Sequence, residues 1–171
     1  MITATQFSNE TSPQLAIELT FDQREKSRLR VTSQCGVEIG VSLRPGTIMK
    51  HGDVLTLSDG RAAKIVAAME NVMEVTVNAS VQKLTAIAYH IGNRHVPMEV
   101  GEGVLRLLPD HVLRAMIEGL GGTVVETTAR FTPESGAYGH SHVHHSHDDL
   151  GHGGRIHDGL QPRVSPSNDI R

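Results

Sequence analysis

Histidine is the residue type that this sequence concentrates. Seven of the eleven histidines lie between positions 140 and 157. Imidazole is the commonest side-chain ligand of divalent zinc, nickel and copper. In an extended backbone alternate side chains point the same way, so neighbouring imidazoles of this segment can share one ion. We therefore predict a metal-binding segment whose ligands are His140, His142, His144, His145, His147 and His152.

Two alternatives without a metal compete for the same segment: a purification tag and a polar tail that only aids solubility. A tag is normally an uninterrupted terminal run, whereas these histidines are irregularly spaced and fourteen residues follow the last of them. Metal binding is therefore favoured over both alternatives. Since the segment is too polar to bury a core, we expect it to be disordered and to capture several metals rather than select one.

A second candidate ligand, His95, follows a predicted helix in the run Gly92-Asn93-Arg94-His95. Gly92 is expected to end that helix in a left-handed conformation, and Pro97 prevents the helix from resuming. His95 would then lie on a short, stiff loop. One imidazole cannot hold an ion tightly, but a twofold axis near His95 would bring two copies to one ion. The alternative is an ordinary exposed loop histidine.

His111 is the third candidate ligand. Pro109 and Asp110 suit the first turn of a helix, where the backbone N–H groups are free and the dipole favours a negative charge. His111 would then lie in that first turn. It could bind metal there or be a solvated surface residue, and the sequence favours neither.

Four basic residues are spaced by two in the sequence: Arg24, Lys26, Arg28 and Arg30. If this segment is extended, the four side chains form a basic stripe that could dock an acidic partner. An ordinary solvated strand face explains the same pattern and is the preferred interpretation.

The elements that position these residues form an α+β protein. To about residue 70, apolar residues alternate with polar ones, at 15–21, 29–31 and 37–43, and Asp59-Gly60 is a hairpin signal, which predicts a small all-β domain. Beyond it the pattern changes to strand–helix–strand–strand–helix–strand, with helical spacing at 81–91 and 113–120, typical of a ferredoxin-like βαββαβ fold. We expect a β-rich domain over 1–72, a ferredoxin-like domain over 73–133 and a disordered tail over 134–171.

Composition excludes several classes of protein. A net charge of −3 argues against a dedicated nucleic-acid binder, and no apolar run approaches the roughly 20 residues of a membrane helix. The N-terminus lacks the pattern of a signal peptide and the single cysteine, Cys35, cannot form an internal disulfide, so we expect a cytoplasmic protein. Motifs of metalloproteases, serine hydrolases and P-loop proteins are missing from the sequence, which predicts no enzyme activity.

The segments LTFDQREKSRLRV, LRPGTIMKHGDVL, AYHIGNRHVP and DHVLRAMIEGLG resemble the urease accessory nickel metallochaperone family. The resemblance covers roughly residues 15 to 131, and the run around His95 is its specific part. It implies a first domain similar to the peptide-binding subdomain of Hsp40 chaperones and a second that forms a homodimer. It further implies that His95 and its symmetry mate hold one Ni²⁺, delivered to the urease apoprotein with an accessory GTPase. Where some relatives have a histidine, this chain has Pro109, which puts an accessory site at His111 in doubt.

Three functional hypotheses follow, each with its own consequence. The leading one is a homodimeric carrier in which the tail captures Ni²⁺ and passes it to His95, with zinc or copper able to substitute. A histidine-rich nickel or zinc buffer is the alternative, and it predicts that the tail alone is needed. A scaffold that recruits partners through the basic stripe is the third, and it predicts that charge reversal there leaves metal binding intact.

Overall fold

A computed structural model describes residues 1–78 and 80–135 of the chain. The predicted tail ligands from His140 to His152 therefore lie outside the described residues. The described part belongs to a single compact unit, Met1–Ala137. Within it no helix is long and apolar enough to cross a membrane.

The first part of the chain is a six-stranded mixed sheet with strand order β2-β6-β5-β1-β4-β3. The alternating segments of the sequence form its strands, and Asp59-Gly60 closes the antiparallel hairpin between the fifth and the sixth, with Gly60 at a φ of 87°. An additional first strand, which the sequence did not predict, pairs in parallel with the fourth. The strands are β1 (Ile2–Phe7), β2 (Leu15–Leu19), β3 (Arg28–Thr32), β4 (Glu38–Ser42), β5 (Val54–Leu57) and β6 (Ala62–Ala67).

The apolar positions of these strands pack into one cluster. Ile17, Ile39, Leu55 and Ile65 have no exposed surface and belong to it. Alternation in the sequence thus separates a buried face from a solvated one, as expected for a half-buried sheet.

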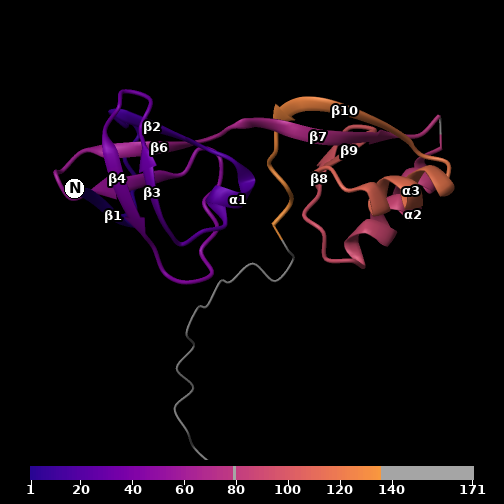
Figure 1. Ribbon diagram of the computed structural model, residues 1–171, viewed down its shortest axis with the longest axis horizontal. Helices are drawn as coiled ribbons and strands as arrows, with labels where there is room; N and C mark the ends of the chain where they lie inside the picture. Colours follow the sequence, from indigo (N-terminus) through magenta and orange to yellow (C-terminus); the bar gives the residue numbers. More distant parts are fainter. Residues whose placement is uncertain (79, 136–171) are drawn as a thin grey trace, which may run out of the picture. The chain divides into compact units, whose positions relative to one another are not determined.

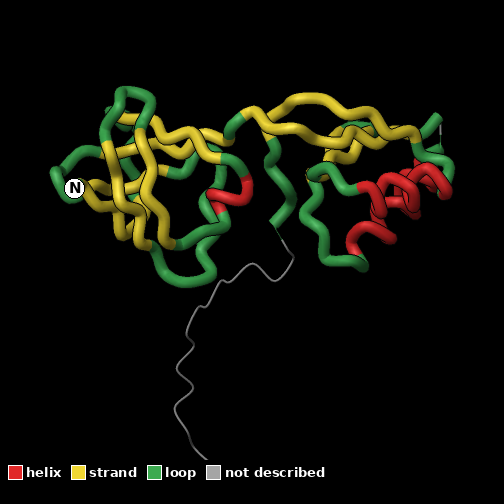
Figure 2. The backbone as a smooth tube through the Cα atoms, in the orientation of Figure 1, coloured by secondary structure: helices red, strands yellow, loops and turns green. Residues whose placement is uncertain are grey.

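A short helix, α1 (Phe21–Arg24), follows β2 and was not predicted from the sequence. It is fixed by a capping box: the Thr20 hydroxyl accepts from the Gln23 backbone N–H, and the Gln23 side chain accepts from the Thr20 N–H at 3.0 Å. Figure 2 shows this helix as a short red segment beside the strands.

Because α1 interrupts the extended segment, the predicted basic stripe is wrong for Arg24. The Arg24 side chain is only 2% exposed. Lys26 lies between the helix and the next strand, where it pairs with Asp22 at 2.6 Å. Arg28 and Arg30 are exposed on β3, as the pattern predicted.

The second part of the chain confirms the ferredoxin-like prediction. Its antiparallel sheet has the order β10-β7-β9-β8, and its two helices lie on one face of the sheet (Figure 1). The chain order is strand–helix–strand–strand–helix–strand. The elements are β7 (Met69–Thr76), α2 (Val81–Gly92), β8 (Glu99–Gly101), β9 (Val104–Leu107), α3 (His111–Gly119) and β10 (Thr123–Arg130).

A separate apolar cluster fixes both helices on this sheet. Ile87 and Ile91 of α2 and Leu113 and Ile117 of α3 are buried against strand residues such as Val75. These are the helical positions that the i, i+3, i+4 spacing predicted. The register of the two helices, and so the position of the loops that carry the candidate histidines, follows from this packing.

Candidate metal-binding site

His95 lies on a tight loop directly after α2. The Arg94 N–H donates to the Ile91 carbonyl at 3.0 Å and the His95 N–H to the Gly92 carbonyl at 2.9 Å, so the chain turns within two residues of the helix end. The His95 side chain is exposed. The predicted position of His95 on a short loop after the helix is therefore confirmed.

The backbone of this loop differs from the prediction at one residue. Gly92 is the last residue of α2, and its φ is not positive; Asn93, the C-cap, is also in the right-handed helical region. The left-handed residue is His95 itself, with a φ of 55°, and it is the one non-glycine residue with positive φ in the described ranges 1–78 and 80–135. For a residue with a Cβ this conformation costs roughly 1–2 kcal/mol. Such strain is characteristic of functional positions.

The residues that follow this loop are held in place by packing and by an ion pair. Val96 and Met98 pack against the core of the second sheet. Glu99 follows on β8, and its carboxylate accepts from the Arg106 guanidinium at 2.7 Å. Arg106 also donates to Glu74 of β7 at 2.7 Å, and these two carboxylates raise the pKa of Arg106. The His95 loop is thus held between the α2 core residues and an ion-paired strand.

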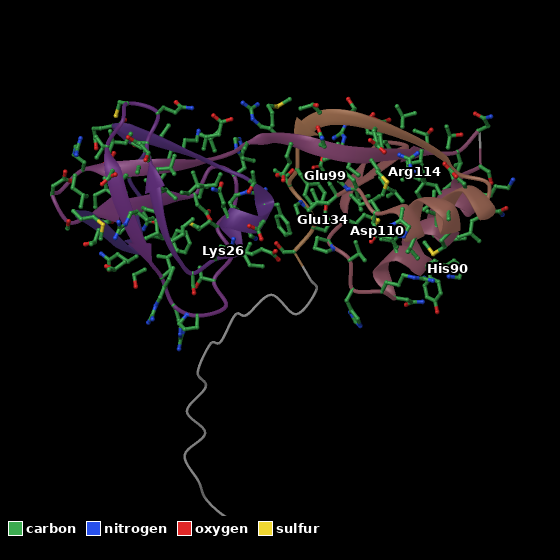
Figure 3. All side chains as sticks on the ribbon, in the orientation of Figure 1. Lys26, His90, Glu99, Asp110, Arg114 and Glu134 are labelled. Carbon is green, nitrogen blue, oxygen red and sulfur yellow. The ribbon has the colours of Figure 1, made fainter. Side chains whose placement is uncertain are left out.

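His90 is the other histidine near this loop. It lies on the last turn of α2 (Figure 3), and its ring meets that of Tyr89 edge-on with centroids 5.6 Å apart. The His90 carbonyl accepts from the Arg94 guanidinium at 2.9 Å, which ties the loop back to the helix. Tyr89 is 64% exposed.

His111 is the first residue of α3 and is exposed. It lines an open cavity of about 340 Å³ together with Asp110, Arg114 and Glu126. Both carboxylates there are already engaged: Asp110 accepts from two backbone N–H groups at the start of α3, and Glu126 accepts from Arg114 at 2.5 Å. His111 is therefore the imidazole ligand that this cavity offers, beside two carboxylates that each use one oxygen in these contacts.

None of these histidines completes a metal site within the described part of the chain. No group of three or more His, Cys, Asp or Glu side chains that could hold a metal ion occurs in residues 1–78 and 80–135. Structural metal sites need three or four protein ligands. A site with three or four protein ligands at His95 or His111 would therefore need ligands from outside these residues.

Cys35 offers no further metal site. Its thiol is exposed, and a hydrogen bond with the Ser33 hydroxyl, 3.2 Å away, lowers its pKa. A single thiolate does not make a metal site by itself.

The described residues thus form a mixed six-stranded sheet followed by a ferredoxin-like sheet with an exposed histidine loop, the arrangement of a two-part α+β protein. The sequence matches the family model described as "UreE urease accessory protein, N-terminal domain" over residues 2–68 and the one for the C-terminal domain over residues 70–158. The chain belongs to the UreE family of urease accessory proteins.

Individual relatives support this assignment along most of the chain. The urease accessory protein UreE of Nitrosospira multiformis is 44% identical over 146 residues, which is 85% of this chain and 81% of the relative. The UreE of Saccharophagus degradans is 45% identical, over 90% of this chain and 86% of the relative. The family resemblance seen in the sequence is thereby confirmed, and with it a role in the urease accessory system.

Some features that position the site residues were not predicted from the sequence. The left-handed φ of His95 has no signal of its own, because the nearby Gly92 is the residue type that this conformation normally selects. The ion pairs of Arg106 join residues 32 and 7 positions away, which no local pattern shows. Helix α1, which carries Arg24, did have a signal, namely the Thr20–Gln23 capping box at its start.

Proposed function

We propose that this protein is a nickel metallochaperone that carries Ni²⁺ to the urease apoprotein during assembly of its active site. The observation that supports this most is the exposed, left-handed His95 on an anchored loop, in a chain that belongs to the UreE family. In this proposal Ni²⁺ is the cargo of the protein and not a structural cofactor. Zinc or copper can occupy the same imidazoles.

The proposed site forms at a twofold axis of a homodimer, where two copies of His95 meet at one ion. Two observations support the dimer. His95 belongs to no group of three or more candidate ligands within the described residues, so a tight site is incomplete in one chain. The second domain also exposes an apolar side chain on each helix, Tyr89 of α2 and Val112 of α3, which are available to pack against a second copy of the chain.

The histidine-rich tail over 134–171 supplies the remaining ligands and the first capture of the ion. It follows the ferredoxin-like domain, which we assign to residues 73–133, after the β-rich domain over 1–72. Imidazole ligands without thiolates leave the bound ion exchangeable, which a carrier needs. His111 is a further candidate ligand, since it lies free at the edge of its cavity.

The partners in this proposal are the urease apoprotein and its accessory GTPase, in the cytoplasm. The chain itself has no phosphate-binding GxxxxGK[ST] motif, so nucleotide hydrolysis must come from the partner. The exposed Arg28 and Arg30 of β3, together with Lys26, remain candidates for docking an acidic surface. Arg24 is removed from this set by its burial.

A nickel titration by calorimetry on a chain ending at Ser135 tests the proposal, with the oligomeric state measured by light scattering on the same sample. We expect a dimer that retains a specific site with one ion per two chains. His95→Ala in this shortened chain should abolish the site and leave the dimer intact. His51→Ala is the matched control, because it removes one exposed histidine from the first domain and should leave the site unchanged.

Two results would contradict the carrier. If nickel binding disappears with the tail, the protein is better described as a histidine-rich buffer. If the His95→Ala chain keeps its tight site, the ion lies elsewhere and His95 has no role in holding it.

A further inference from the structure

A cavity of about 330 Å³ lies away from the candidate metal ligands and is lined by Arg24, Lys50, His51, Thr132 and Pro133. Arg24 belongs to α1, Lys50 and His51 to the turn before β5, and the last two residues follow β10. Arg24 is buried and the other four are partly or fully exposed, so Arg24 forms the floor of the cavity and the others its walls. It is an open depression rather than an enclosed pocket.

Arg24 places an incompletely compensated positive charge at this floor. One terminal nitrogen of its guanidinium donates to the Phe131 carbonyl, and the guanidinium carbon lies 5.3 Å from the centre of the Phe21 ring. The Nε atom is buried and has no hydrogen-bond partner among the described residues. Burial lowers the pKa of Arg24, because the charged form loses water, and Glu70 and Glu25 offset only part of this effect. A buried guanidinium without a paired carboxylate is costly unless an anion approaches it.

His51 adds a hydrogen-bond donor to the wall of the cavity. Its Nδ1 accepts a hydrogen bond from the Ala67 backbone N–H at 3.1 Å. That nitrogen therefore carries no proton, and the proton of the ring is on Nε2, which becomes a donor. Lys50 supplies an ammonium group beside it, and its side chain is exposed.

Acceptors are missing from the lining. No carboxylate belongs to the residues that line this cavity. The nearby acidic groups are engaged elsewhere: Glu70 accepts from the Phe21 N–H at 2.9 Å, Asp53 from the Lys50 N–H at 2.7 Å, and Glu99 from the N–H and hydroxyl of Thr132. The lining residues thus combine two cationic side chains and an imidazole N–H with no carboxylate among them, and Glu70 and Glu25 offset only part of the charge of Arg24.

We infer that this cavity is a binding site for a small oxyanion, a phosphate or carboxylate group, held by Arg24, Lys50 and His51. Such groups accept several charge-assisted hydrogen bonds at once, and a guanidinium matches their geometry. Since Arg24 also contacts the Phe131 carbonyl at the end of β10, the bound anion stabilises the contacts between α1 and the segment after β10. The site takes its residues from parts of the chain that carry no proposed metal ligand.

Calorimetric titration of the metal-free full-length chain tests this site, with sodium phosphate in one arm and sodium succinate in the other, at ionic strength held constant with sodium chloride. We expect saturable binding of at least one anion at one per chain. Lys50→Met should weaken it at least about fivefold, the loss expected for a charged hydrogen-bond donor. Lys64→Met is the matched control, because Lys64 is exposed on β6 and does not line the cavity, and it should bind as the unaltered chain does.

The two arms separate the sources of the oxyanion. Tight binding in the phosphate arm alone identifies a phosphate-bearing ligand, and tight binding in the succinate arm alone a carboxylate. If neither anion binds saturably, or if Lys50→Met and Lys64→Met bind equally well, the cavity is not an oxyanion site and the inference is wrong. Amide shifts of His51 and Thr132 on titration provide a second readout, and their absence would overturn it as well.

Discussion

At the scale of single residues, His95 combines an exposed metal-binding side chain with a backbone conformation that its Cβ disfavours. Glycine would adopt a φ of 55° without strain, so folding stability alone does not explain a histidine there. A histidine at this position therefore lowers the free energy of unfolding relative to glycine, and it places an imidazole on the loop. Such a loss of stability is expected where a side chain is needed for function.

Substitutions of His95 separate the effect of its strained backbone conformation from the effect of its imidazole. His95→Gly should be more stable to urea than His95→Ala by about 1 kcal/mol, because only alanine retains the strained Cβ. Asn93 is the matched control: its φ is −64°, so Asn93→Gly should be no more stable than Asn93→Ala. Equal stabilities of the two His95 variants would show that the loop relaxes and carries no strain.

The chemistry of His95 could be predicted from the sequence, but its conformation could not. The residue type, the preceding helix and Pro97 together indicated a stiff loop with an imidazole on it. The choice of left-handed residue depends on how the loop rejoins the core through Val96 and Met98, which is a tertiary contact. The full ligand set of the proposed site is also beyond a single-chain pattern, since the described residues contain no group of three or more candidate ligands.

At the scale of elements, the start of α3 fixes where His111 lies. Asp110 is the N-cap, and one carboxylate oxygen accepts from the Val112 N–H at 2.8 Å and the Leu113 N–H at 2.9 Å. These donors have no partner within the helix, so the cap stabilises the first turn that carries His111.

Removing this cap should destabilise the protein measurably. Asp110→Ala is expected to lower the free energy of unfolding by about 1 kcal/mol, as measured by urea denaturation followed by circular dichroism. Asp110→Asn keeps an acceptor oxygen and should recover most of that loss. If the Asn variant is as unstable as the Ala variant, the charge rather than the hydrogen bonds stabilises the helix.

The elements themselves were predictable where the apolar pattern was strong. The strands at 15–19 and 38–42 alternate cleanly, and α2 and α3 repeat apolar residues at helical spacing. The strand Ile2–Phe7 was missed because Ala4 is its one fully buried residue and polar side chains fill most of the rest. Helix α1 was missed because four residues are too few for a periodic pattern, and its capping box is the single local signal.

At the scale of the whole molecule, a small aromatic cluster joins residues that are far apart in the chain. Phe21 of α1 and Phe131, just after β10, meet edge-on with ring centres 5.3 Å apart, and Val72 of β7 packs with them. Arg24 donates to the Phe131 carbonyl, and Glu70 accepts from the Phe21 N–H. A pair separated by more than a hundred residues leaves no periodic trace, so the sequence could not have predicted this cluster.

Phe131→Ala tests whether this cluster couples the two sheets during unfolding. Phe131 has no exposed surface, and truncating a buried phenylalanine typically costs about 3–5 kcal/mol. In the unaltered chain we expect the amides of β6 and those of β7 to exchange with a common free energy of opening in native-state hydrogen exchange. In the variant the two sets should separate, because the contacts of Phe131 with both Phe21 and Val72 are lost. Phe7→Ala is the control, since Phe7 is 43% exposed. It should lower the free energy of unfolding by only a fraction of the Phe131→Ala loss. The amides of β6 and β7 should still open with a common free energy in this variant. If the amides of β6 and β7 still open together in Phe131→Ala, the covalent link and the polar contacts at Glu70 and Arg24 are enough to couple the two sheets. The aromatic cluster would then contribute packing alone.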